Sequence, residues 1–384
     1  MNAMYLARVL ALLGCLAAAC APAAAPPASA PRPTAGAPAA AAPPPAAPAA
    51  AAPAPASAAP PAAPTKARFG TQPVAGYAPV YVAADRGYFQ QEGIDLEFVP
   101  FSNASEIIPA LATGQLEAGT AGGNPAGWNA VARGVDMKIV LDMITLTPGH
   151  GSTALVMRKE VYDTGRGRTL GDLPGLNIGV TPPGKATVSA CALARGLERV
   201  GLTLDDLSLQ PLTFPDMVPA LANGSIDGGI LAEPFVTLAR RQGTTVRVMG
   251  LDEMYPNFSL SHVAFSSAFY ASRPAAKAFA RAFIHGGRDY LAAIDGRTSE
   301  ADRAQIDQII ARHTNIDAAV IHEMVPSGWN PNGFPTREST QYCYQFFRDQ
   351  GQIPEPPSEA AMAALWGTDI VEEVLPGIGR LPDR

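Results

Sequence analysis

Two stretches of the chain repeat one pattern, the first starting at Pro109 and the second at Pro219. Pro109–Thr120 reads PALATGQLEAGT, and Pro219–Ile230 reads PALANGSIDGGI. Each stretch begins with small residues suited to a helix, stops at a glycine (Gly114 or Gly224), turns, and ends in a run suited to a buried strand. Because matching strands flank both copies, the pair predicts two similar βαβ-type lobes.

Strands and helices alternate around these copies, which indicates an α/β domain beginning at residue 66. The predicted strands are Ala67–Gln72, Ile94–Val99, Leu116–Ala121, Lys138–Met143, Asn177–Thr181, Leu207–Thr213 and Ile226–Leu231. The predicted helices between them include Tyr77–Phe89, Asn103–Ala112 and Lys185–Val200. Four more follow without a repeat, and we expect them to pack outside the first lobe: Ala275–Ile294, Ala301–His313, Glu338–Gln350 and Glu359–Val374.

The first 20 residues resemble an export signal. Arg8 is followed by an apolar stretch, Val9–Ala19, that is too short for a permanent membrane span. The stretch ends at Cys20, after small residues, which predicts lipidation of that cysteine. Two alternatives remain: Cys15 as the lipidated residue, or simple cleavage after Ala17-Ala18-Ala19.

Residues 21–65 form an Ala/Pro-rich segment that separates this signal from the domain. Of the 44 residues from 21 to 64, 39 are Ala or Pro. Such a composition cannot bury a core, and frequent proline prevents a long helix, so an extended, disordered tether is predicted. A lipid anchor and a tether would hold residues 66–384 outside the cytoplasm, near a membrane.

Charge and motifs exclude several classes of function. The net charge is −6 without a basic block, so nucleic acid is not an expected partner. We expect no metal and no cofactor, because no CxxC and no His pair at zinc spacing occur. The absence of a GxSxG motif favours a protein that is not an enzyme. Cys191 and Cys343 could pair in an oxidising compartment, or Cys191 could be a packed thiol.

Ligands of open parallel sheets bind beyond the carboxyl ends of the strands, so the loops there are the candidate site. Several of these loops run into helix starts, where free N–H groups favour an acceptor-rich ligand. Asn103 and Ser105 have the alternative role of helix caps. Lys185 is the only cation in these loops, and Glu233 offers a carboxylate for an amine-bearing ligand or an ion pair across the cleft.

Several motifs resemble the nitrate/sulfonate/taurine and thiamine-pyrimidine-precursor family of substrate-binding proteins of ABC transporters. The similar stretches lie between about residues 66 and 290. They are APVYVAADRGYF at Ala78–Phe89, EGIDL at Glu92–Leu96, ALATGQLEAG at Ala110–Gly119, LPGLNIGV at Leu173–Val180, Pro219–Asp227, and the pair Glu233-Pro234.

The resemblance implies a type-II periplasmic-binding-protein fold, in which two lobes close on a ligand. Lobe 1 would span about 66–150 plus 260–384 and lobe 2 about 151–259, with crossings near Thr145–Thr153 and Tyr255–Ala264. It further implies a monomer that delivers its ligand to an ABC permease and its ATPase. The implied ligand contacts are Tyr77, Asn103, Ser105, Gly123, Asn124, Gly184, Thr187, Asp216 and Glu233.

The sequence leaves the ligand open. The scarcity of cations disfavours a small inorganic anion, and a sulfonate such as taurine, a pyrimidine precursor or an aromatic acid are the organic classes considered. Two further functions stay as alternatives: a ligand-sensing lipoprotein that serves a signalling partner, and an enzyme that makes a pyrimidine precursor. The missing Cys-rich motif of such enzymes counts against the last.

Overall fold

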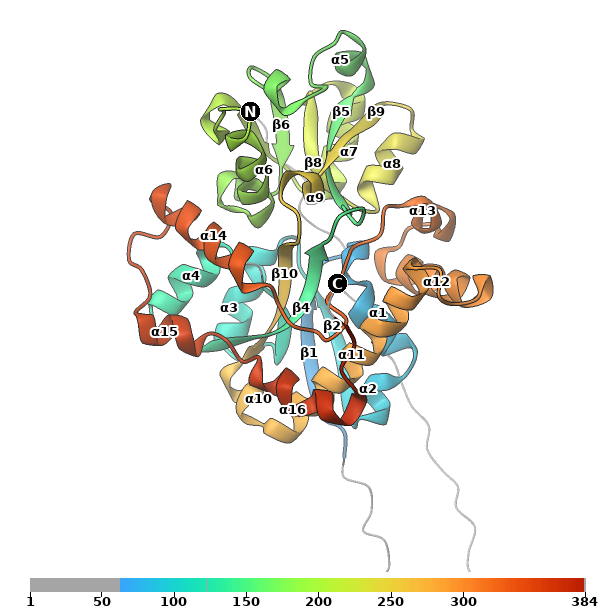
Figure 1. Cartoon of the computed structure of the whole chain (residues 1–384), viewed down its shortest axis with the longest axis vertical. Coiled ribbons are helices and arrows are strands. Elements are labelled where there is room, and N and C mark those ends of the chain that lie inside the picture. Colours follow the sequence, from blue (N-terminus) through green and yellow to red (C-terminus); the bar gives the residue numbers. More distant parts are fainter. Residues whose placement is uncertain (1–62, 122, 383–384) are drawn as a thin grey trace, which may run out of the picture. The chain divides into compact units, whose positions relative to one another are not determined.

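Two five-stranded β-sheets covered by helices form the folded part of the protein in the computed structural model (Figure 1). The structure describes residues 63–121 and 123–382, so Cys15, Cys20 and most of the Ala/Pro-rich segment lie outside the described residues. The first sheet, in the order β2-β1-β3-β10-β4, consists of β1 (Thr65–Thr71), β2 (Ile94–Pro100), β3 (Ala118–Ala121), β4 (Met137–Leu146) and β10 (Phe258–Ser266). The second, in the order β7-β6-β8-β5-β9, consists of β5 (Thr153–Arg158), β6 (Asn177–Val180), β7 (Ser208–Pro211), β8 (Gly228–Ala232) and β9 (Thr245–Gly250).

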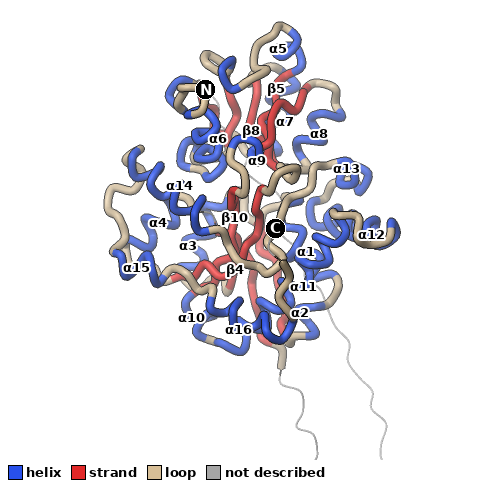
Figure 2. Tube along the Cα trace, in the orientation of Figure 1, coloured by secondary structure: helices blue, strands red, loops and turns tan. Residues whose placement is uncertain are grey.

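The two sheets share one topology. In the first, β1 pairs in parallel with β2 and β3, while β10 lies antiparallel between β3 and β4. In the second, β6 pairs in parallel with β7 and β8, while β5 lies antiparallel between β8 and β9. The chain crosses from β4 to β5 and returns from β9 to β10, and the strands of both sheets are red in Figure 2. The predicted fold class, two βαβ lobes joined by crossing segments, is therefore confirmed.

We call the first sheet with its helices lobe 1 and the second sheet with its helices lobe 2. Early in lobe 1 lie α1 (Ala78–Asp85), α2 (Tyr88–Gln91), α3 (Ile107–Ala112) and α4 (Pro125–Ala132). Lobe 2 contains α5 (Lys159–Asp163), α6 (Val188–Glu198), α7 (Phe214–Asn223), α8 (Phe235–Arg241) and α9 (Leu251–Met254). After β10 follow α10 (Ser267–Ala271), α11 (Arg273–Ile294), α12 (Glu300–Thr314), α13 (Ala318–Glu323), α14 (Arg337–Asp349), α15 (Glu359–Ala364) and α16 (Asp369–Ile378).

The repeated stretches occupy equivalent places in the two lobes, as α3–β3 and α7–β8. After the turn, an acidic residue of each copy forms hydrogen bonds with the backbone of the neighbouring strand, β1 or β6. Glu117 accepts a hydrogen bond from the backbone N–H of Arg68 at 2.8 Å, and its own N–H donates to the Arg68 carbonyl at 3.1 Å. Asp227 makes the same two bonds with Asn177, at 2.9 and 2.8 Å. The sequence repeat thus encodes a structural clamp between strands.

Two predicted helices are interrupted. Tyr77–Phe89 breaks at Gly87, whose φ of 75° lies in the left-handed region that favours glycine. Glu359–Val374 breaks between α15 and α16, because the chain there pairs with β4. The Ile139 N–H donates to the Leu365 carbonyl at 2.7 Å, and the Gly367 N–H donates to the Ile139 carbonyl at 2.9 Å.

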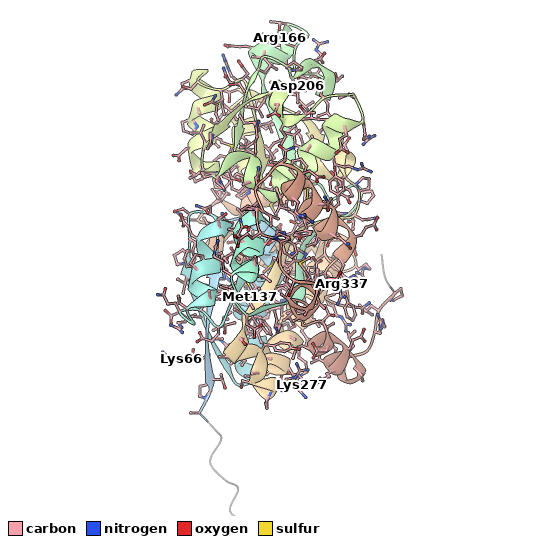
Figure 3. All side chains as sticks on the ribbon, turned by 90° about the vertical axis from the view of Figure 1, so that its left-hand side faces the viewer. Lys66, Met137, Arg166, Asp206, Lys277 and Arg337 are labelled. Carbon is pink, nitrogen blue, oxygen red and sulfur yellow. A yellow bond between two sulfur atoms is a disulfide. The ribbon has the colours of Figure 1, made fainter. Side chains whose placement is uncertain are left out.

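We expected the C-terminal helices to pack outside lobe 1, but two of them also contact lobe 2. Helix α14 packs against α4 and β10 of lobe 1 but also against α6 of lobe 2, and α13 contacts α8. Figure 3 shows the charged side chains of Arg166 and Asp206 at the end formed by lobe 2, and those of Lys66 and Lys277 at the opposite end. Helices α13 and α14 therefore lie at the junction between the lobes, whereas these labelled charged residues lie far from it.

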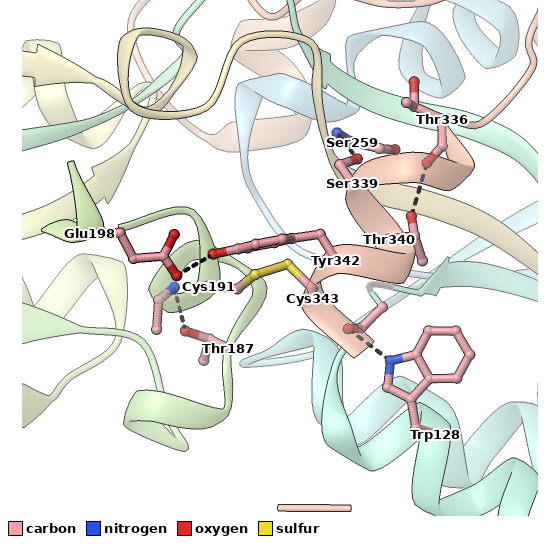
Figure 4. The surroundings of a disulfide bond; sticks show 12 residues. Trp128, Thr187, Cys191, Glu198, Ser259, Thr336, Ser339, Thr340, Tyr342 and Cys343 are labelled. Carbon is pink, nitrogen blue, oxygen red and sulfur yellow. Dashed lines mark hydrogen bonds between the residues drawn. A yellow bond between two sulfur atoms is a disulfide. The ribbon is translucent and has the colours of Figure 1, made fainter. Parts of the chain in front are cut away.

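A disulfide joins the lobes at this junction (Figure 4). Cys191 of α6 and Cys343 of α14 are bonded, with 5.8 Å between their Cα atoms, and both are buried. Beside them, the Tyr342 hydroxyl donates to the Glu198 carboxylate at 2.7 Å. Of the two alternatives for Cys191, the structure contains the disulfide and not the packed thiol. No helix in the described part of the chain is both long and apolar enough to cross a membrane.

Candidate functional site

A cavity of about 100 Å³ lies where the carboxyl ends of the two sheets face each other. Lobe 1 contributes the loop after β1, the start of η2 (Ala104–Glu106) and the residue before α4. Lobe 2 contributes the loop after β6, the starts of α6 and α7, and the residue after β8. The polar lining residues are Gln72, Tyr77, Asn103, Ser105, Asn124, Ser152, Thr153, Thr181, Thr187, Ser189, Glu233 and Ser261. The cavity is thus built by both lobes.

The structure brings six of the nine predicted ligand contacts to this cavity: Tyr77, Asn103, Ser105, Asn124, Thr187 and Glu233. The other three do not line it. The Gly123 carbonyl accepts a hydrogen bond from the Trp128 indole at 3.0 Å (Figure 4), and Gly184 forms a left-handed turn with φ of 79°. Asp216 is exposed and accepts from the Thr213 hydroxyl at 2.5 Å at the start of α7. A ligand-binding role for the six stays a prediction.

The cavity is polar but poor in charge. Its described lining includes no Lys or Arg, and Glu233 is its one acidic residue. Lys185, the cation expected nearby, does not line the cavity and instead pairs with Asp205 on the surface. A strongly anionic ligand would therefore find no cationic partner among these lining residues.

Two of the helix starts at the cavity, those of α4 and α6, are capped by side chains at their own N-termini. Asn124 accepts a hydrogen bond from the Gly127 N–H at 3.0 Å at α4, and Thr187 accepts from the Ala190 N–H at 3.2 Å at α6. These caps occupy backbone donors that an anion could otherwise use. The amide group of Asn124 also points its N–H toward the Ser105 hydroxyl, at 3.5 Å.

Tyr77 supplies a neutral phenol to the cavity wall. Its side chain is buried, and its hydroxyl donates to Gln72 at 3.2 Å. Burial raises the pKa of Tyr77 because the phenolate would lose hydration. Tyr77 therefore stays protonated and serves as a hydrogen-bonding group.

Glu233 is engaged by the protein itself. Its side chain is buried, and its carboxylate accepts hydrogen bonds from the Thr237 N–H and hydroxyl, both at 2.9 Å, and from the Val325 N–H at 3.2 Å. Its carbonyl accepts from the Ala75 N–H of lobe 1 at 3.1 Å. Burial raises the pKa of Glu233 despite these donors. Neutral donors from both lobes thus take the place of the ion pair or amine considered from sequence.

Several lining residues were not among the predicted ligand contacts. Gln72 and Thr181 directly follow β1 and β6, so the rule about strand ends could have found them. Ser152 and Ser261 belong to the predicted crossings, so their position between the lobes could have identified them. Within residues 63–121 and 123–382, no group of three or more His, Cys, Asp or Glu side chains could hold a metal ion.

Comparison with known proteins gives relatives that bind small molecules. A family model described as NMT1/THI5 like matches residues 75–293. The chain is 29% identical over 231 residues to the riboflavin-binding protein RibY of Chloroflexus aurantiacus, covering 57% of this chain and 60% of that protein. It is 26% identical over 216 residues to the taurine-binding periplasmic protein of Escherichia coli, covering 56% and 63%. The alignments thus span less than two thirds of each of these relatives.

Solved structures share the fold at lower identity. The alkanesulfonate-binding protein SsuA from Xanthomonas axonopodis pv. citri, bound to MOPS, has a TM-score of 0.63 at 19% identity and covers 79% of this chain and 99% of its own. The desulfurization enzyme DszB has a TM-score of 0.57 at 16% identity, with 82% and 100% covered. At these identities the likeness is one of fold.

Proposed function

Because the chain belongs to the NMT1/THI5-like family, we propose that it is an extracytoplasmic substrate-binding protein that delivers a small organic ligand to an ABC permease and its ATPase. The observation that carries this proposal is the cavity between the lobes, whose wall comes from both sheets and both crossings. A ligand that touches both lobes stabilises their closed arrangement, and release follows opening. The permease and its ATPase would distinguish the closed, ligand-bound form from the open form.

The ligand we propose is neutral or weakly acidic. The names of the relatives include a riboflavin-binding protein and a taurine-binding protein, so these relatives do not fix one ligand class. The lining of this cavity has hydrogen-bonding side chains and no Lys or Arg, and this favours a pyrimidine precursor or another heterocyclic or aromatic compound over a sulfonate.

Binding is favoured over catalysis by the chemistry of the described residues. Cys191 and Cys343 are joined in a disulfide and do not line the cavity, so neither offers a nucleophilic thiol there. The carboxylate oxygens of Glu233 already accept three hydrogen bonds. The fold likeness to DszB therefore carries no argument for enzymatic activity here.

A thermal-shift screen tests this function. The panel contains riboflavin, pyrimidine precursors, aromatic acids, taurine, alkanesulfonates and nitrate. A ligand at about 100 times its Kd should stabilise the protein by about 2.7 kcal/mol, and calorimetry then gives its affinity. A flat response across the panel from folded protein would contradict the proposed ligand classes.

A matched pair of variants locates the site. Asn103 lines the cavity and Asp216 does not, although both begin helical segments. Asn103→Ala should weaken the binding of a hit by about tenfold, the value of one hydrogen bond, while Asp216→Ala should leave it unchanged. The reverse pattern would move the site out of this cavity.

We also propose that Cys20 carries a lipid and that residues 21–65 form the tether. Cys20→Ser should shift the protein from the membrane to the soluble fraction, while Cys15→Ser should not. Incorporation of labelled fatty acid gives an independent measurement. Release by Cys15→Ser alone would assign the anchor to the other cysteine, and a soluble, unlabelled wild-type protein would mean that the signal is simply cleaved.

A further inference from the structure

A second chamber adjoins the cavity. Its volume is about 340 Å³, against about 100 Å³ for the cavity. Gln72, Val74 and Phe214 line both, so the two spaces adjoin at these residues. We call the first space the inner cavity and the second the outer chamber.

The outer chamber differs from the inner cavity in chemistry. Its walls include three phenylalanines and three prolines: Phe101, Phe214, Phe235, Pro73, Pro100 and Pro215. The rings of Phe214 and Phe235 lie 5.9 Å apart and nearly parallel, at 22°. No charged residue belongs to its described lining. These walls come from both lobes and suit the face of an apolar or aromatic group.

The volumes of the two spaces indicate which part of a ligand each can hold. The inner cavity is smaller than the cavity of about 150 Å³ that accepts one benzene molecule in a well-studied protein variant. It therefore holds a polar group of a few atoms and not a whole ring system. The outer chamber reaches the lower end of the range of pockets for drug-sized ligands, about 300 Å³.

We infer that the ligand is bipartite, with an uncharged hydrogen-bonding head in the inner cavity and an apolar or aromatic tail in the outer chamber. This inference rests on the proposed binding function and extends it to the class of ligand. The head meets the polar side chains that both lobes present, while the tail leaves water and lies between Phe101 and Phe214.

The charge of the head follows from the partners available to it. Asn124 and Thr187 already cap α4 and α6, and Lys185 is paired with Asp205 outside the cavity. An anionic head would enter beside Glu233 without a cation to balance it, which carries a large cost in a buried site. A cationic head would find the Glu233 oxygens occupied. An amide, a lactam or a similar neutral group fits all of these constraints.

Primary alkyl amides from propionamide to octanamide test the inference, with hexanoate and hexane-1-sulfonate as charged analogues of hexanamide. The measurement is the Kd of each compound by calorimetry or by competition. We expect affinity to rise about fourfold for each added methylene, the value for removing one CH₂ from water. We expect hexanamide to bind at least tenfold more tightly than either anion. Affinity independent of chain length would overturn the tail chamber, and tighter binding of the sulfonate would overturn the uncharged head.

A blocking variant localises the tail. Ser102 is exposed and lines only the outer chamber, so Ser102→Trp should remove the dependence on chain length. Ser208→Trp is the control, because Ser208 is exposed and lines neither space. If Ser102→Trp does not fold, Phe101→Ala serves instead, because Phe101 lines only the outer chamber, and it should flatten the same series. Unchanged chain-length dependence in the folded variants would overturn the assignment.

The two proposals can fail separately. Absence of binding by every amide overturns the inferred ligand class, even if the thermal-shift panel yields a hit. That hit would leave the binding function standing.

Discussion

The two flanks of the molecule join lobe 1 to lobe 2 by different chemistry (Figure 1). On the disulfide flank, α14 is bonded covalently to α6 through Cys343 and Cys191. On the Glu233 flank, α13 and residues 324–330 reach lobe 2 through hydrogen bonds and one ion pair, including Val325 to Glu233 and Ser327 to Ser152. The disulfide keeps α14 attached to α6, so the opening that the proposed function requires would break the contacts of the Glu233 flank.

Loss of the disulfide should have the largest effect on stability. The bond closes a loop with a sequence separation of 152, and closing a loop of this length in the unfolded state is worth about 5 kcal/mol. Cys191→Ala combined with Cys343→Ala should lower the free energy of unfolding by that amount, measured with denaturant. Reduced wild-type protein is the control and should behave alike. If the free energy of unfolding falls by less than about 1 kcal/mol, the disulfide contributes little to the stability of the protein.

Removal of the Glu233 side chain should have the next largest effect. Glu233→Ala leaves the Thr237 and Val325 donors without their acceptor in a buried place. We expect a loss of about 3 kcal/mol, because hydrogen bonds to charged groups are strong and unsatisfied buried donors are costly. Glu355→Ala, at an exposed position, is the control. If both variants are equally stable, the Glu233 flank is held by packing alone.

The Glu233 flank should also respond to pH through Asp142 of β4. The Asp142 carboxylate accepts hydrogen bonds from the Asn330 N–H and the Thr145 hydroxyl, each at 2.9 Å, and burial raises its pKa to about 7. The folded state therefore holds a proton that the unfolded state releases near pH 4. Its stabilising contribution is complete below about pH 4 and is lost as pH rises through about 7.

Denaturation of Asp142→Asn beside the wild type from pH 4 to 8 measures this effect. All other titrating groups are common to both proteins, so the difference between their stabilities isolates Asp142. We expect the wild type to lose stability relative to the variant as pH rises. Parallel curves would show that Asp142 titrates at the same pH in both states.

The parallel strands and their loops were predictable because they rest on local patterns. The repeat at Pro109 and Pro219 predicted α3–β3 and α7–β8, and the loops after the strands predicted Tyr77, Asn124 and Glu233 as neighbours of one space. Strands β5 and β9 were not predicted. Strand β10 was predicted only as part of a crossing, because its place between β3 and β4 depends on pairing across more than 100 residues.

The remaining details depend on tertiary contacts that no local pattern carries. Asp216 follows a strand like the other candidates, but its bond with Thr213 holds it at the exposed start of α7. The spacing of Cys191 and Cys343 allowed a disulfide without requiring it. Their proximity comes from α14, which lies across both lobes.

The smallest expected effect belongs to the exposed ion pair of the Glu233 flank. Arg241 and Glu323 lie 2.9 Å apart, with 39% and 45% of their side chains exposed. The Arg241 guanidinium lowers the pKa of Glu323 through its hydrogen bond, yet solvent and salt screen such a pair. Arg241→Ala should leave the denaturation midpoint close to that of wild type, and any difference should vanish at high salt. A double-mutant cycle with Glu323→Ala isolates the pair. A coupling as large as the Glu233→Ala effect would mean that the surface pair, and not the buried carboxylate, holds this flank closed.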